Sequence, residues 1–229
     1  MDNAWGGLIP AICLMTTLHP HSSLLSVSLL EARELTCIRG QRELFQGLSF
    51  GISGGECLHV CGENGVGKTS LLRLLSGLSR PEMGEVLWGG KSIVSDSASY
   101  RHQLLYMGHR DALKEDLTSL ENLEMYAVLD DVALSQENAL ATLWRFGLRG
   151  REDLPVSCLS AGQKRRVLMA RMITRQAKIW ILDEPFNALD SKAVQVLQEL
   201  IEEHVDAGGI VILTSHQALA IKGLKVLKL

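Results

Sequence analysis

The sequence lacks an apolar stretch long enough to cross a membrane as a helix. Such a helix needs about 18–20 consecutive apolar residues. The longest apolar run near the N-terminus, from Leu8 to Met15, is interrupted by Pro10. We therefore expect any association with a membrane to go through a partner protein.

A large excess of charge is also missing. The formal net charge is -3 at pH 7, which gives no support to binding of nucleic acid, so none is expected as a partner. No lysine or arginine precedes Arg33, whereas a signal peptide starts with positive charge and a transit peptide is rich in arginine. Residues 1–28 are therefore interpreted as a loosely ordered N-terminal extension, with Met15 as a later candidate start.

A disulfide framework is absent as well. The cysteines are odd in number and irregularly spaced, which is typical of reduced thiols in a cytosolic protein. They are Cys13, Cys37, Cys57, Cys61 and Cys158. On an expected strand, Cys57 and Cys61 share one face and His59 points to the other, which weakens the interpretation as a metal site. We interpret both cysteines as small, buried apolar residues.

The composition and length that remain are those of an ordinary globular protein. Of the 229 residues, 46% are hydrophobic and 21% are charged, as in soluble domains with a packed core. This length fits one large domain. We expect that domain to cover residues 29–229.

One stretch fits the phosphate-binding pattern G-x-x-x-x-G-K-[ST]. It comprises Gly62, Glu63, Asn64, Gly65, Val66, Gly67, Lys68 and Thr69, and continues into Ser70. A strand over 57–61 and a helix over 70–77 give it the required context. Backbone N–H groups at the start of that helix can surround a phosphate. Lys68 can reach the β- and γ-phosphates of ATP, and Thr69 can bind Mg²⁺.

The surrounding pattern predicts an α/β fold. Strands and turns over 29–60 predict a small antiparallel sheet laid against the nucleotide-binding core. Further strands are expected over 85–90, 104–107, 179–182 and 209–214, with helices over 118–129, 135–147, 164–173 and 190–208. The helices within about 110–165 interrupt the α/β alternation. We therefore predict a P-loop NTPase core with a small antiparallel β subdomain and an inserted helical subdomain.

Polar residues directly follow two of the expected strands. Asp183 and Glu184 follow one, and His216 follows the other. Hydrolysis of ATP needs a metal ion, neutralised charge and an oriented water. Asp183 is therefore a candidate Mg²⁺ ligand, Glu184 can poise the water, and His216 can contact the γ-phosphate. Alone, each is equally typical of a solvated turn or a structural histidine; their order after the phosphate loop favours catalysis, with Lys68 as the third catalytic residue.

The stretch Leu159-Ser160-Ala161-Gly162-Gln163 precedes a basic helix. With the motifs above, it resembles the signature of the ATP-binding-cassette (ABC) ATPases. The resemblance implies that the signature of one protomer faces the γ-phosphate bound by another. Ser160 and the backbone around Gly162 would donate hydrogen bonds to that phosphate. It also implies a head-to-tail dimer of two copies around two ATP molecules, closed by a two-fold axis.

Five stretches are similar to a narrower group, the ATP-binding subunits of the haem exporter of cytochrome c maturation. They are Leu71–Pro81, Gly84–Trp88, Leu117–Leu123, the alanine-containing signature and Gly209–Gln217. The similarity covers about 30–217. It implies a peripheral ATPase on the cytoplasmic face of the inner membrane, bound to an integral-membrane permease. Its activity would energise haem export or release of the haem-loaded chaperone.

Other readings of the motifs stay open to different degrees. An ATPase of another exporter, for lipoprotein or a small molecule, fits the motifs equally. A non-transport ABC ATPase is disfavoured, because repair members insert a long coiled coil between phosphate loop and signature, and translation members carry two cassettes. A binding module without hydrolysis is disfavoured by the intact Lys68, Asp183, Glu184 and His216.

Two positions depart from the wider ABC pattern. The aromatic residue that stacks on adenine is replaced by Arg39, whose planar guanidinium can also stack on a base. The glutamine that normally touches Mg²⁺ is replaced by His109. Because Mg²⁺ prefers oxygen ligands, we expect His109 to act through water or as a hinge toward the helical subdomain, and a purely structural role stays open.

Overall fold

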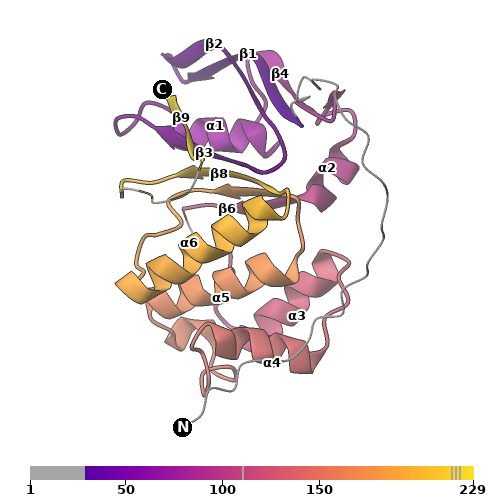
Figure 1. The fold of residues 1–229 in the computed structure, drawn as a ribbon, viewed down its shortest axis with the longest axis vertical. Helices are drawn as coiled ribbons and strands as arrows, with labels where there is room; N and C mark the ends of the chain where they lie inside the picture. The colour runs from indigo at the N-terminus through magenta and orange to yellow at the C-terminus, as the bar shows by residue number, and fades with distance from the viewer. Residues whose placement is uncertain (1–28, 110, 218, 220, 222) are drawn as a thin grey trace, which may run out of the picture.

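The computed structural model describes residues 29–229 except 110, 218, 220 and 222 (Figure 1). Its strands form two sheets. In the antiparallel sheet the strand order is β2-β1-β4-β5, and in the parallel sheet it is β6-β7-β8-β3-β9. The antiparallel sheet comprises β1 (Leu30–Arg39), β2 (Arg42–Ile52), β4 (Met83–Trp88) and β5 (Lys91–Ser92). The parallel sheet comprises β3 (Glu56–Cys61), β6 (Leu104–Met107), β7 (Ile179–Leu182), β8 (Ile210–Thr214) and β9 (Lys225–Lys228).

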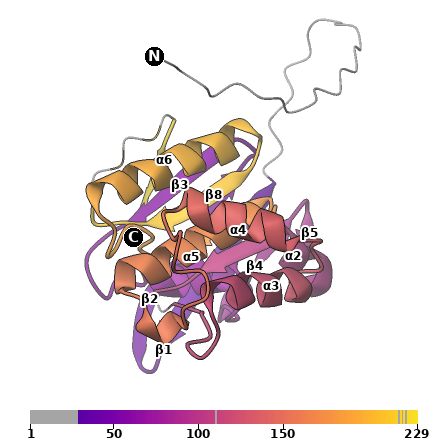
Figure 2. The ribbon, with the colours of Figure 1, turned by 90° about the horizontal axis from the view of Figure 1, so that it is seen from below.

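The parallel sheet lies in the middle of the molecule because both of its faces are apolar. In β7, Ile179 and Ile181 face one hydrophobic cluster, which includes α1 (Lys68–Leu75) and the antiparallel sheet. Trp180 and Leu182 face the other cluster, which includes the helices α3 to α6. Continuous apolar strands of this kind are typical of a parallel sheet covered on both sides. Figure 1 shows the two coverings, with α1 and the antiparallel sheet on one side and α3–α6 on the other, and Figure 2 looks onto the side of α3–α6.

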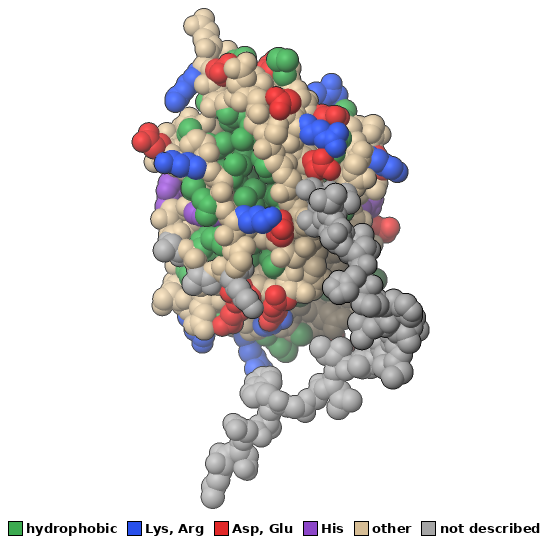
Figure 3. Space-filling view, turned by 45° about the horizontal axis from the view of Figure 1, so that its top comes forward, with side chains coloured by type: hydrophobic (Ala, Val, Ile, Leu, Met, Phe, Trp, Pro, Cys, Tyr) green, Lys and Arg blue, Asp and Glu red, His purple; other side chains and the backbone are tan. Residues whose placement is uncertain are grey.

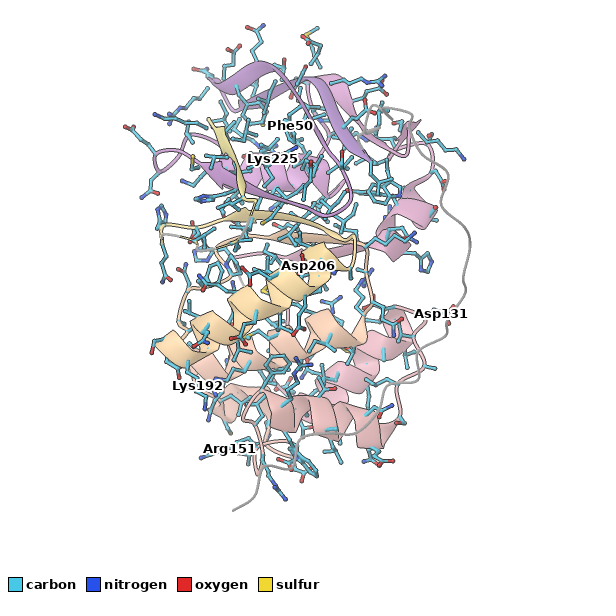
Figure 4. All side chains as sticks on the ribbon, in the orientation of Figure 1. Phe50, Asp131, Arg151, Lys192, Asp206 and Lys225 are labelled. Carbon is cyan, nitrogen blue, oxygen red and sulfur yellow. The ribbon has the colours of Figure 1, made fainter. Side chains whose placement is uncertain are left out.

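Three helices, α3, α4 and α6, begin directly after their predicted caps, whereas α5 begins three residues earlier than the predicted 164 and α1 two residues earlier than the predicted 70. Thr118 caps α3 (Ser119–Leu129) with a complete capping box, and Ser135 caps α4 (Gln136–Arg145). The basic helix is α5 (Ala161–Thr174), and Asp190 caps α6 (Ser191–Asp206), whose length is marked by Lys192 and Asp206 in Figure 4. Side-chain oxygens at these positions accept from backbone N–H groups that have no partner within the helix. The expected α/β architecture is therefore confirmed.

One helix was not expected from the sequence. Helix α2 (Ser97–Gln103) is short, and Tyr100 is its one buried residue. The Tyr100 hydroxyl donates to the backbone oxygen of Leu75 at 2.6 Å. The sequence of such a helix shows no apolar periodicity, because the helix is stabilised by a tertiary contact and not by an apolar face.

The helices α3 and α4 share their core with the rest of the domain. Their buried residues Leu123 and Leu143 belong to the same hydrophobic cluster as α5, α6 and one face of the parallel sheet. The boundaries of the helical subdomain, about 110–165, stay a prediction. The predicted N-terminal extension, residues 1–28 with Cys13, lies outside the described residues. Among the residues that the structure describes, no helix is both long and apolar enough to span a membrane.

The four described cysteines, Cys37, Cys57, Cys61 and Cys158, are free thiols. Cys57 is buried as predicted, and its burial raises the pKa of the thiol to about 12. Cys61 is half-buried. On the face of the molecule in Figure 3, basic and acidic side chains lie interspersed around a band of hydrophobic side chains, in keeping with the small net charge.

A stacked pair of rings joins the end of α6 to the parallel sheet. The His204 ring lies on the Trp180 ring with centroids 3.9 Å apart and planes 7° apart. Burial lowers the pKa of His204 below its ordinary value of 6.5, although its contact with the backbone oxygen of Lys178 opposes that shift. The folded state therefore favours the neutral imidazole.

We predict that acid destabilises the protein partly through His204. The unfolded chain binds a proton near the ordinary value of 6.5, but the folded chain binds it only at lower pH. The free energy of unfolding should therefore fall as pH drops below that value toward the lower folded pKa. His204→Phe keeps the stack without a titrating group, so its denaturation midpoint should change less than the parent's between about pH 7.5 and about pH 5.5.

The control is His102→Gln, since His102 is exposed on α2. This variant should keep the parent's pH dependence. An undiminished pH dependence in His204→Phe would contradict the prediction.

Candidate functional site

The phosphate loop connects β3 to α1, as the sequence predicts. Gly67 precedes the helix with φ 119°, in the left-handed region. A Cβ atom there would lie 3.1 Å from Leu44 Cβ, so glycine meets both a conformational and a steric demand. The Lys68 ammonium donates to the backbone oxygens of Gly62 at 2.8 Å and Glu63 at 3.1 Å. The loop therefore gathers a cation and the free N–H groups of a helix N-terminus, which together suit a phosphate.

Sheet register brings the other predicted residues to this loop. The parallel pairing aligns Leu182 of β7 with Leu213 of β8, and Val60 of β3 with Thr214. The segments that follow these strands therefore leave the same edge of the sheet. Ligand sites in open α/β sheets lie at this edge.

Asp183 lies at the centre of a buried hydrogen-bond network. Its side chain is 2% exposed. One carboxylate oxygen accepts from the Thr69 hydroxyl at 2.8 Å, and the other accepts from the Thr214 hydroxyl at 2.8 Å. The backbone N–H of Asp183 donates to Met107 at the end of β6. Thr69 and Asp183 thus offer adjacent oxygen donors, the type that Mg²⁺ prefers.

Glu184 and His216 face each other beside Asp183. The Nε2 atom of His216 lies 3.3 Å from a carboxylate oxygen of Glu184. The Glu184 side chain is 14% exposed and that of His216 is 60% exposed. A carboxylate that is mostly shielded but reaches an open cavity can accept a proton from a water held there.

A cavity of about 310 Å³ joins these groups. Most of the predicted site residues line it: Asn64, Gly65, Gly67, Lys68, Thr69, Ser70, His109, Asp183, Glu184 and His216. Gly62, Glu63 and Val66 belong to the same loop but are not among the described residues that line the cavity. The predicted Arg39 is exposed at the tip of the β1–β2 hairpin, where it lies opposite Arg42 in the register of the two strands.

Ser160 and Gly162 lie apart from this cavity. Ser160 is exposed and caps α5 through a capping box with Gln163. A Cβ atom on Gly162 would lie 3.0 Å from the backbone oxygen of Ala188, so the signature packs against the segment that leads into α6. Neither residue is among the described residues that line the cavity. The two predicted halves of the site are thus separate surfaces of one chain.

A buried arginine connects the signature helix to the catalytic segment. Arg165 of α5 is 5% exposed, and its guanidinium donates to the backbone oxygens of Glu184 at 2.7 Å and Pro185 at 3.0 Å. It also lies 3.5 Å from a carboxylate oxygen of Asp111. Burial lowers the pKa of Arg165, and Asp111 opposes that shift.

Sequence reasoning missed three residues of this site. Leu44 lines the cavity from β2, and no local pattern marks it. In the sequence, Arg165 looks like one more charged residue of a basic helix. Its position on the helix face that carries the apolar residues is a weak signal that its side chain is buried. Thr214 could have been found, since aligning the ends of the two predicted strands places it beside Asp183.

Comparison with known proteins identifies relatives of the whole domain. The family model described as ABC transporter matches residues 45–187. The chain is 51% identical to "Cytochrome c biogenesis ATP-binding export protein CcmA" of Dechloromonas aromatica, covering 84% of this chain and 95% of that protein. It is 49% identical to the protein of the same name in Escherichia coli K12, covering 87% of this chain and 95% of that protein.

Solved structures show the same fold. The structure of an ATP-binding subunit of an ABC transporter matches with a TM-score of 0.74 and 29% identity, covering 82% of this chain and 80% of that one. An ATP-binding cassette in a dimeric post-hydrolysis state, bound to ADP and Pi, matches with a TM-score of 0.71 and 24% identity, covering 82% and 88%.

Substitution of the two charged groups in the cavity should have different effects. Glu184→Gln keeps the size of the side chain but removes the base, so ATP should still bind while hydrolysis falls about 10²–10⁴-fold. Lys68→Ala removes the cation of the phosphate loop, so both binding and turnover should be lost. Phosphate release and equilibrium nucleotide binding measure the two effects.

Glu199→Gln on the exposed face of α6 is the matched control and should behave as the parent. A parental rate of hydrolysis in Glu184→Gln would remove that residue from the catalytic role.

Proposed function

This chain belongs to the ABC transporter family, and from that premise we propose that it is the ATP-hydrolysing subunit of an export complex for cytochrome c biogenesis. The proposal rests on sequence identity: about half of the aligned residues are the same in proteins named as cytochrome c biogenesis export proteins, and the match covers nearly their whole length. The cavity supports the chemistry, because residues of the phosphate loop line it together with Asp183, Glu184 and His216.

The residues of the cavity divide the work of hydrolysis. The N-terminus of α1 and Lys68 hold the phosphates. Thr69 and Asp183 would hold Mg²⁺, which would neutralise charge on the phosphate oxygens. Glu184 accepts the proton of the attacking water, and His216 lies beside it to contact the γ-phosphate.

A second copy of the chain completes the site in this proposal. Ser160 and Gly162 start a helix whose N-terminal N–H groups suit a phosphate, yet they lie away from the cavity of their own chain. In a head-to-tail dimer each signature would face the other copy's ATP. Such an arrangement is closed by a two-fold axis and has no unpaired interface.

A second groove of the domain, separate from the cavity at the phosphate loop, is a candidate binding site for the membrane partner. A groove of about 770 Å³ runs between the end of α1, α2, β6 and the C-terminal ends of α3 and α5. Leu78 and Leu129 on its walls are 56% and 69% exposed. Exposed apolar side chains that gather along a groove are typical of an interaction site. We refer to it as the docking groove.

The docking groove also has a charged floor. Arg171 of α5 and Arg175, which directly follows α5, both pair with Asp130, and Arg175 donates to the backbone oxygen of Arg101. This cluster connects α3, α5 and α2 beneath the groove. A permease segment seated there would contact the helical part and the sheet part together, so it would sense their relative movement. We infer that the chain works as a peripheral subunit on the cytoplasmic face of the inner membrane.

The docking groove is tested by changing its apolar wall. Leu129→Asp should lower copurification of the integral-membrane subunits with the tagged chain at least several-fold, because burying a charge without a partner is costly. ATP hydrolysis by the isolated chain should stay unchanged. Val226→Asp is the matched control, since Val226 is 62% exposed on β9. Equal partner loss in both variants would contradict this seat.

The cellular function is tested by haem attachment. Cells with only the Glu184→Gln form should assemble the membrane complex but accumulate haem-loaded chaperone and make little c-type cytochrome. Haem staining of denaturing gels measures this, because only covalently attached haem remains bound. The b-type cytochromes, which need no covalent attachment, should stay near normal, as should c-type cytochromes in Glu199→Gln cells. Normal c-type bands with Glu184→Gln would refute the export function and leave the ATPase activity standing.

A further inference from the structure

Glu184 has an unusual backbone conformation for a residue with a side chain. Its φ is 51°, in the left-handed region. Few residues other than glycine adopt this region, and those that do are concentrated at functional sites where neighbouring groups hold them in place. The conformation directs the Glu184 side chain, so the groups that hold the backbone also determine where the carboxylate lies.

Thr214 holds Glu184 on its N–H side. The Glu184 N–H donates to the Thr214 hydroxyl at 2.9 Å, and that hydroxyl donates to a carboxylate oxygen of Asp183 at 2.8 Å. Thr214 has no exposed surface, and the end of β8 fixes its backbone. The single hydroxyl therefore sets the distance between the Asp183 carboxylate and the backbone of Glu184.

Arg165 holds the same residue on its carbonyl side. Its Nη2 atom donates to the Glu184 oxygen at 2.7 Å and lies 3.5 Å from the Asp183 oxygen, while its Nε donates to the Pro185 oxygen at 3.0 Å. The Glu184 oxygen also accepts from the N–H of Asn187 at 3.3 Å. Arg165 thus ties three successive carbonyl groups to the helix that starts at the signature.

We propose that Thr214 and Arg165 are positioning residues for hydrolysis, which hold Glu184 from its two backbone sides so that its carboxylate meets the attacking water. The inference rests on the proposed role of Glu184 as the base. Neither side chain lines the cavity, so neither acts on the nucleotide directly. Misplacing a catalytic group by about 1 Å can lower a rate about 100-fold while substrate binding persists.

The two residues differ in what else they hold. The Thr214 hydroxyl also donates to the carboxylate of Asp183, and the same carboxylate accepts a hydrogen bond from Thr69. Arg165 touches only the backbone of this segment and pairs with Asp111. Loss of the Thr214 hydroxyl should therefore raise the Mg²⁺ concentration needed for half-maximal activity, whereas loss of the Arg165 guanidinium should not.

The experiment compares Thr214→Val with Thr214→Ser, and Arg165→Met with Arg165→Lys, in the full chain. Valine matches threonine in shape without the hydroxyl, and serine restores it. Thr214→Val and Arg165→Met should lower kcat about 10–100-fold with KM for ATP within about threefold of the parent. Thr214→Ser should recover most of the rate, and Arg165→Lys only part of it, because an ammonium cannot reach all three carbonyls.

A readout without turnover separates positioning from general damage. ATP binding at equilibrium should be retained in all four variants, and gel filtration with ATP and Mg²⁺ should show a dimer of Thr214→Val and of Arg165→Met, because ATP that is bound but slowly hydrolysed would hold two copies together. Thr142→Val and Arg145→Met on α4 are controls far from the cavity and should keep parental kcat. The melting temperature of each variant shows whether it is folded.

Several outcomes would overturn the proposal. It is wrong if Thr214→Val and Arg165→Met keep the parental kcat, if Thr214→Ser is as impaired as Thr214→Val, or if ATP binding falls in parallel with kcat. Thr214 and Arg165 lie on different elements. If the variant of one residue fails to fold, the variant of the other residue still tests the proposal. If neither folds, the residues serve folding and not positioning. Parental turnover by Glu184→Gln would instead remove Glu184 as the base, the premise on which this inference rests, and would leave the ATPase activity standing.

Discussion

The hydrogen bonds that Asp183 accepts from Thr69 and Thr214 are the constraint on which the site depends. They join the helix after the phosphate loop to the ends of β7 and β8. A carboxylate that is 2% exposed is stable only if its oxygens are paired. The strands must therefore keep their register, since a shift of one residue in either strand would separate these donors from the carboxylate. Phosphate binding and the fold of the sheet are thus secured by the same contacts.

The packing of the sheet explains how a small active site can affect distant surfaces. One hydrophobic cluster joins one face of the parallel sheet to α3, α4, α5 and α6, and the docking groove lies where α3 and α5 end beside α2 and β6. Helix α5 starts at Ser160, passes Arg165 under the catalytic segment and ends near Arg171 and Arg175 in the floor of the groove. A close-packed helix moves as a unit. Displacement at its signature end is therefore transmitted to its groove end.

Most of the fold and the groups that line the cavity could be predicted from the sequence, whereas the groups that we propose to position Glu184 could not. Capping residues, apolar strands and the phosphate loop are local patterns, and they located α3, α6, β7 and the cavity residues. The function of Thr214 and Arg165 depends on hydrogen bonds across 30 and 19 positions of the chain, which no local pattern contains. Helix α2 was missed for the same reason, because Tyr100 is secured by Leu75 from another helix. His109 lines the cavity, whereas Arg39 is not among the described residues that line it, and the contacts of both with nucleotide stay predictions.

The magnitudes of the contacts around Glu184 explain why such a conformation persists. A residue other than glycine in the left-handed region costs on the order of 1–3 kcal/mol. A hydrogen bond between neutral groups contributes about 0.5–1.5 kcal/mol, and one from a charged donor about 1.5–3 kcal/mol. Thr214 and Arg165 supply one of each kind, so together they are large enough to offset the strain. The Glu184 backbone is therefore held from both β8 and the signature helix, which makes the position of its carboxylate sensitive to a movement of α5.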